Sequence, residues 1–135
     1  MTEAEALAKA ISGLDAAMYA YGVAGAKVAP GLRDRALAGL RNGRTSRDRV
    51  DSALAASGGT VPGAAAAYEI DPPVTDETSA AAAIGVVETR MAGVYGDLAA
   101  ATPAGAGRDA AIAAALECAV RAAAWGAAPV AFPGR

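Results

Sequence analysis

The stretch GGTVPGAAAAYEIDPPV, residues 58–74, connects two pairs of predicted helices and decides how they are arranged. Its glycines and prolines separate a helix predicted over about 31–57 from another that begins near Thr75. Helices of the predicted size are about 40 Å long, and an extended segment of this length reaches about 50 Å. The stretch can therefore cross the whole bundle, so that the next helix begins parallel to the preceding one. An unpacked loop is the alternative, but Tyr68, Ile70 and the adjacent prolines favour a segment docked on the helices.

Four helices are predicted around this crossover. The first begins at the capping-box signature of Thr2 and Glu5 and stops at Pro30, and the fourth covers about 108–125, after the break TPAGAG. Short turns join the first helix to the second and the third to the fourth, which predicts two antiparallel hairpins. One long crossover between two hairpins is the connection found in ferritin-like bundles. We therefore predict a single all-α domain, residues 1–135, with a ferritin-like four-helix fold.

Apolar residues recur mostly every three or four positions along the predicted helices. Such spacing is typical of helix faces that are buried in a bundle. In chain order these residues are Leu7, Ile11, Leu14, Met18, Tyr21, Gly25 and Val28; Leu32, Leu37, Leu40 and Leu54; Ile84, Val87, Met91, Val94 and Leu98; and Ile112, Leu116 and Val120. We expect these residues to face the core.

Composition excludes several classes of protein. The net charge of −2 and the pI near 5.0 argue against nucleic-acid binding, which needs a basic surface. No apolar run approaches the ~20 residues of a membrane span, and the acidic N-terminus MTEAEALAKA is unlike a signal peptide. The single cysteine, Cys118, suits a reducing cytoplasm, and the lack of any histidine excludes Ser-His-Asp and Cys-His catalysis and every histidine-based metal site. We expect a cytoplasmic protein that has no cofactor and binds neither nucleic acid nor membrane.

Three acidic residues, Asp15, Glu88 and Glu117, directly follow predicted core residues near the midpoints of three helices. Midpoints lie level in an antiparallel bundle, so these carboxylates can converge in one layer. On the second helix the spacing of Leu37 and Leu40 continues into two arginines, and a further arginine lies one turn after Glu117. We predict a central charged layer, in which arginines pair with carboxylates, made of Asp15, Arg44, Arg47, Glu88, Glu117 and Arg121. Two alternatives stay open: the charged groups reach solvent beside slim helices, or the three carboxylates bind a metal.

Four further stretches occur together in one order: AAMYAYGV at 16–23, RTSRDRVDSALAA at 44–56, AAYEIDPPVTDETSA at 66–80 and AVRAAAWGAAPVAFPG at 119–134. In these stretches the chain resembles the actinobacterial ferritin-like proteins of the DUF4439 family. The resemblance implies a four-helix ferritin-like bundle and no established activity. Relatives commonly carry a Glu-His pair where this chain has Leu14 and Asp15, and a histidine near Gly43. Because both histidines are absent here, the resemblance implies a lost di-metal site in which arginine charge replaces metal charge.

These features leave three functions open. We favour a metal-free bundle with a structural or interaction role and no catalytic residue, rather than an enzyme. A small-ligand binder would instead use a cleft lined by Tyr19, Tyr21, Tyr95 and Arg44. A metal protein would use the three acidic residues of the central layer, and without nitrogen ligands it would favour Mg or Mn over iron. Exposed alanine-rich helix faces also favour a homodimer, while nothing in the sequence identifies another protein partner.

Overall fold

The computed structural model describes residues 1–129 and 131–132, and the last positions of the stretch at 119–134 lie partly outside these. The described residues form four helices and no β-strand. The helices are α1 (Glu3–Gly25), α2 (Pro30–Ala56), α3 (Glu77–Ala101) and α4 (Ala106–Ala124). None of the helices in this part of the chain is long and apolar enough to cross a lipid bilayer.

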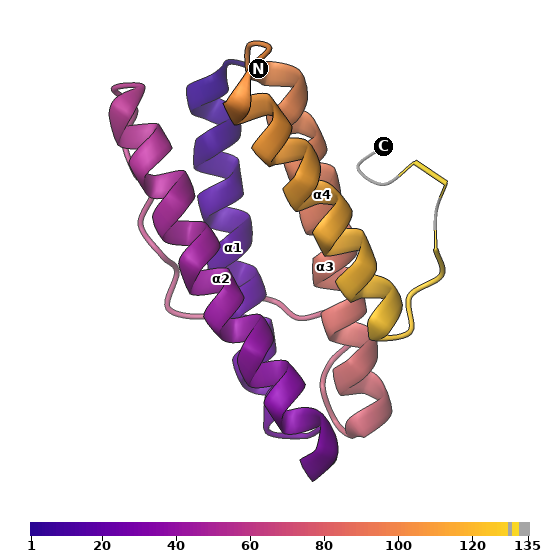
Figure 1. The fold of residues 1–135 in the computed structure, drawn as a ribbon. Helices are drawn as coiled ribbons and strands as arrows, with labels where there is room; N and C mark the ends of the chain where they lie inside the picture. The colour runs from indigo at the N-terminus through magenta and orange to yellow at the C-terminus, as the bar shows by residue number, and fades with distance from the viewer. Residues whose placement is uncertain (130, 133–135) are drawn as a thin grey trace.

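The four helices form two antiparallel hairpins (Figure 1). Helices α1 and α2 make the first hairpin and α3 and α4 the second, and the crossover between them runs along the bundle from the end of α2 to the start of α3. Helices α2 and α3 therefore run in the same direction. The predicted four-helix bundle with a long crossover is confirmed, and Tyr68 of the crossover packs on Tyr19 of α1 with ring centroids 5.7 Å apart.

Local signals in the sequence account for the helix ends. Thr2 and Glu5 exchange side-chain and backbone hydrogen bonds in a capping box at the start of α1. Asp76 makes the same reciprocal arrangement with Ser79 at the start of α3. Gly58 has a φ of 76°, a left-handed conformation that glycine adopts freely, and it ends α2 directly after its C-cap.

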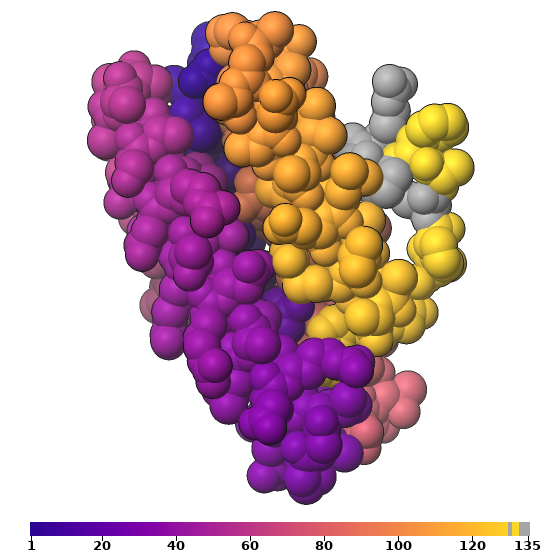
Figure 2. Space-filling model, viewed as in Figure 1, coloured from indigo at the N-terminus to yellow at the C-terminus, as the bar shows by residue number. Residues whose placement is uncertain are grey.

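The helices are not equally close to one another. Helix α1 packs against α2 and α3, and α3 packs against α4. Helices α2 and α4 are separated along much of their length by a groove, through which α1 is visible (Figure 2). At one end Arg35 of α2 closes this groove, because its Nη1 donates to the carbonyl of Ala124 at 3.3 Å and its guanidinium lies 5.5 Å from the ring centroid of Trp125.

The buried face of α2 differs in part from the predicted one. Its buried residues are Ala36, Gly39, Gly43, Val50 and Leu54, whereas Leu37 is 47% exposed. Small residues on this face allow α1 to approach closely: a Cβ added to Gly43 would lie 2.8 Å from Cγ of Met18, and one added to Gly39 would collide with the ring of Tyr21. The prediction was right for Leu54, and Leu32 and Leu40 pack partly buried against the core. It was wrong for Leu37, because glycine and alanine, rather than leucine, form the contact with α1.

The buried face of α4 also differs from the predicted one. Ile112, Leu116 and Val120, here named the α4 stripe, are 46%, 50% and 70% exposed. The core-facing residues are instead Ala111, Ala115, Cys118 and Ala122. Residues spaced by four advance about 400° around a helix and drift by about 40° at each step. Alternating steps of four and three cancel that drift, so the smaller residues keep facing α3.

Candidate functional site

An ion pair joins the two helices of the first hairpin. Arg47 of α2 donates from Nε to Oδ1 of Asp15 on α1 at 2.6 Å, and from Nη2 to Oδ2 at 3.5 Å. The side chain of Asp15 is only 7% exposed and that of Arg47 is 26% exposed. The hydrogen bond to Asp15 raises the pKa of Arg47. This bidentate contact offsets the free-energy cost of removing the carboxylate from water.

A second ion pair joins the helices of the second hairpin. Arg121 of α4 donates from Nε to Oε2 of Glu88 on α3 at 3.1 Å, and the Glu88 side chain is 6% exposed. The other carboxylate oxygen of Glu88 accepts a hydrogen bond from the hydroxyl of Tyr21 at 3.1 Å. Burial lowers the pKa of Arg121, but the charge and hydrogen bond of Glu88, together with the neighbouring Cys118 and Tyr21, outweigh it and leave the pKa raised.

The two pairs follow one pattern. In each hairpin the first helix supplies the acid and the second supplies the arginine, 32 residues later for Asp15 and Arg47 and 33 residues later for Glu88 and Arg121. Tyr21 belongs to the first hairpin and donates to the acid of the second, so it connects the hairpins through a buried hydrogen bond. Burial, and then the charge of Glu88, raise the pKa of Tyr21 and keep this hydroxyl protonated. Each hairpin therefore neutralises its own buried carboxylate with its own arginine.

The remaining residues of the predicted layer lie elsewhere. Arg44 and Glu117 are exposed, and neither makes an ion pair with another described residue. Arg44 lies off the α2 face that holds Gly43 and Arg47, and Glu117 precedes the buried Cys118 of α4. The prediction misplaced Glu117 because it used the wrong face of α4, and it misplaced Arg44 because the buried position on α2 is the neighbouring Gly43.

The predicted tyrosine cleft is not one site. Tyr19 packs on Tyr68 of the crossover, Tyr21 reaches Glu88 in the bundle centre, and Tyr95 lies under the groove between α2 and α4. Sequence reasoning missed the contact of Tyr21 with Glu88. The signal available for it was the position of Tyr21 on the same 4-3 stripe as Leu14, which places its hydroxyl in the core.

The acidic residues do not fit a di-metal site. Each buried carboxylate is already engaged by an arginine, and Glu117 points to the surface. Among residues 1–129 and 131–132, no three His, Cys, Asp or Glu side chains are grouped so that they could hold a metal ion. The donor set therefore lacks both the nitrogen ligands and the convergence of carboxylates that such bundles use.

A cavity of about 330 Å³ occupies the groove between α2 and α4 that is visible in Figure 2. Its buried floor comes from all four helices: Leu7, Val50, Tyr95, Leu98 and Ala111. Ser46 and Arg49 line it from α2 and Glu117 lines it from α4, while Glu3 and Thr102 lie toward one end. The volume and the mainly apolar floor are typical of sites for small molecules.

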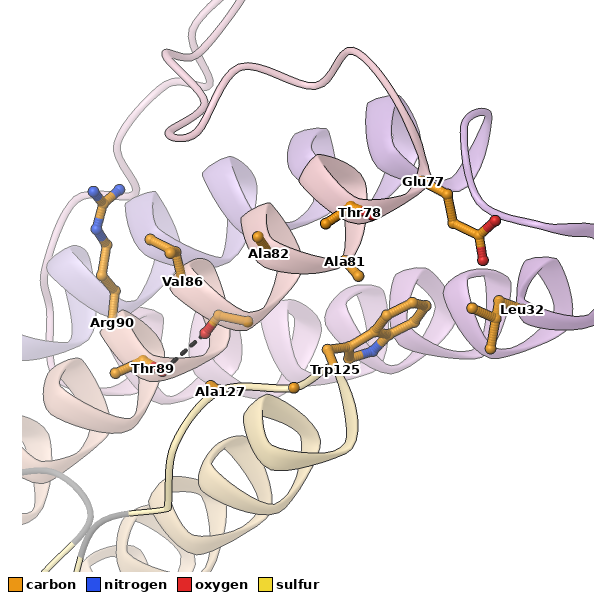
Figure 3. Close-up of a pocket in the computed structure, with 12 residues that line it drawn as sticks. Leu32, Glu77, Thr78, Ala81, Ala82, Val86, Thr89, Arg90, Trp125 and Ala127 are labelled. Carbon is orange, nitrogen blue, oxygen red and sulfur yellow. Dashed lines mark hydrogen bonds between the residues drawn. The ribbon is translucent and has the colours of Figure 1, made fainter.

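A second, shallower hollow of about 740 Å³ follows the outer side of α3 (Figure 3). The indole of Trp125 lies near Leu32 and Ala81 in one part of it, and Arg90 lies at the other end. The hydroxyl of Thr89 donates to the carbonyl of Gly85 and is thereby occupied within α3. This hollow contains none of the residues predicted to form a site.

The thiol of Cys118 lies beside the second ion pair, where Nη2 of Arg121 donates to Sγ at 3.3 Å. Burial and the charge of Glu88 raise the pKa of Cys118 from 9.0 to about 12. Burial and the neighbouring Cys118 likewise raise the pKa of Tyr95 to about 12. Both groups are therefore protonated and uncharged at neutral pH, which makes Cys118 a poor nucleophile.

We expect alkaline pH to destabilise the protein through Cys118. An unfolded chain releases this proton near pH 9.0, whereas the folded protein holds it to about 12. Because the folded state then binds more protons, the free energy of unfolding falls as pH rises through this window, by at most about 1.4 kcal/mol per pH unit. Urea unfolding of the wild type and of Cys118→Ala at about pH 8 and about pH 10 measures this. An equal loss in both proteins would contradict it.

Fold and centre together define a four-helix bundle in which two arginines, each partly exposed, pair with two buried carboxylates near mid-height. The sequence matches the domain of unknown function DUF4439 over residues 6–135, and the chain belongs to this family. It is similar to the crystal structure of a conserved hypothetical protein, rv2844, from Mycobacterium tuberculosis, with a TM-score of 0.87 and 30% sequence identity. That likeness covers 91% of this chain and 93% of the other. No protein of curated function matches the sequence.

Proposed function

We propose that this protein is a non-catalytic, metal-free ferritin-like bundle of the cytoplasm that acts by association, with a second copy of itself as partner. The α4 stripe carries this proposal. A helix that fills its core face with alanine and cysteine presents its three largest aliphatic residues to solvent. The two ion pairs support a structural role, because they hold the two helices of each hairpin together at mid-height.

The geometry of the α4 stripe suits self-association. Its residues are spaced by four, and ridges with this spacing interdigitate when two helices cross at about −50°, the commonest packing in globular proteins. The flanking positions are occupied by the alanines at 113, 119 and 123, which allow close approach. A two-fold axis near Leu116 would place the same residues against each other, as symmetric dimers require.

Sedimentation velocity at tens of micromolar tests the dimer. We expect the wild type to sediment at twice the chain mass of 13.1 kDa, and Leu116→Glu to sediment as a monomer, because a charge at the centre of an apolar interface costs several kcal/mol. Leu37→Glu is the matched control, since Leu37 is similarly exposed but lies on α2. A monomeric wild type, or loss of the dimer in both variants, would contradict association through α4.

A second candidate function is the binding of a small ligand in the groove between α2 and α4. The cavity of about 330 Å³ favours it, because Tyr95 and Leu98 form an apolar floor while Ser46 supplies a polar group at its side. A cavity-filling variant, Ala114→Trp, tests this candidate. It should abolish the binding of any small ligand, including an environment-sensitive apolar dye, without unfolding the bundle.

A further inference from the structure

The size of the groove cavity limits what it can hold. A volume of about 330 Å³ is at the small end of the range of about 300–1,000 Å³ for ligand sites, so the cavity suits a small molecule. Tyr95 and Leu98 of the floor are 4% and 6% exposed, and Leu7 beside them is 4% exposed. The body of such a ligand would therefore lie against apolar and aromatic surface.

The two walls of the cavity carry opposite charges. Arg49 lines it from α2 and Glu117 lines it from α4, and both side chains are exposed. Within the described residues neither forms an ion pair, so both remain available to a ligand. A guanidinium binds a carboxylate through a planar pair of donors, and a carboxylate binds an ammonium group. Glu3, at one end of the cavity, adds a second negative charge.

We infer that this groove binds a small zwitterion with an apolar body, of the class of the apolar amino acids, and this inference rests on the second candidate function. The carboxylate of the ligand lies toward Arg49, its ammonium group toward Glu117, and its side chain on Tyr95 and Leu98. An apolar anion would meet the repulsion of Glu117 and Glu3, and an apolar amine would meet that of Arg49. A zwitterion carries one group that is attracted to the charged residue on each wall.

Calorimetric titration of the full chain with three matched ligands tests the inference. L-Phenylalanine carries both charges, 2-phenylethylamine lacks the carboxylate and 3-phenylpropanoate lacks the ammonium group. We expect each analogue to bind at least tenfold more weakly than the amino acid. Arg49→Gln should reduce the affinity for phenylalanine to that for the amine, and Glu117→Gln should reduce it to that for the acid.

Control variants separate the ligand class from the site. Arg41→Gln and Asp97→Asn remove exposed charges outside the cavity and should leave the affinity unchanged. If the three ligands bind equally and Ala114→Trp abolishes all of them, the zwitterion class is wrong while the groove remains a binding site. If none of the three binds, the inference is overturned. If Ala114→Trp also leaves the binding of an apolar dye unchanged, the groove is not the site at all.

Discussion

Replacing Glu88 with leucine is expected to destabilise the protein by about 3–5 kcal/mol, the range for removing one partner of a buried ion pair. Glu88 is 5% exposed and accepts hydrogen bonds from Arg121 and from Tyr21. Leucine would leave the guanidinium without its carboxylate and the tyrosine hydroxyl without its acceptor. Urea unfolding at neutral pH measures the loss.

Glu117→Leu provides the matched control for this prediction. Glu117 is exposed and unpaired among the described residues, so its replacement should change stability by less than about 0.5 kcal/mol. The double variant Glu88→Leu, Arg121→Leu should recover part of the loss, because it removes the stranded charge. A double variant as unstable as Glu88→Leu would show that the stranded guanidinium is not the cause. A loss below about 0.5 kcal/mol for Glu88→Leu would place Glu88 in solvent.

The predicted fold was right where the sequence carried local signals. The capping box at Thr2 and Glu5 begins α1, and the alternation of four and three along α1 identified a buried face that includes Leu7, Ile11 and Leu14. The crossover was predictable from length alone, because only a segment as long as the helices can begin α3 parallel to α2. Each of these features can be recognised within its own segment, without knowing which residues of the other helices pack against it.

The faces of α2 and α4 could not be read in the same way. Alanine is so frequent that a helix such as α4 is apolar on both sides, and the largest residues do not mark the core. A core of small residues is filled by bringing backbones close together, as Gly43 does with Met18. A test for alternating spacing would have favoured positions 111, 115, 118 and 122 over the α4 stripe.

Residues of the candidate site were predicted correctly where the buried face of their helix was predicted correctly. Asp15 and Glu88 lie on α1 and α3, whose stripes were identified, and both are buried acids. Arg47 lies on the buried side of α2 in both the predicted and the observed assignment of that side. Arg121 reaches Glu88 with its long side chain from a position beside the core-facing residues of α4. Arg44 and Glu117 could be placed correctly only by knowing which positions of α2 and α4 are buried. The groove followed from the separation of α2 and α4, which no local pattern encodes.

Adjacent residues of α4 should respond in opposite ways to one substitution. Ala115 is 5% exposed and faces α3, so Ala115→Glu should destabilise by more than about 4 kcal/mol, because it forces an unpaired carboxylate and extra volume into the core. Leu116 is 50% exposed, so Leu116→Glu should change the stability of the monomer by less than about 0.5 kcal/mol.

Both α4 variants carry the same new side chain, and glutamate is a good helix former, so helix propensity contributes little to the contrast. Unfolding midpoints extrapolated to low protein concentration remove the contribution of a dimer. If Leu116→Glu were the more destabilising variant in that limit, the core-facing side of α4 would be the one marked by its large aliphatic residues, and the α4 stripe would be buried. The exposure of the α4 stripe, and the association proposed for it, therefore require Ala115→Glu to be the more destabilising of the two variants.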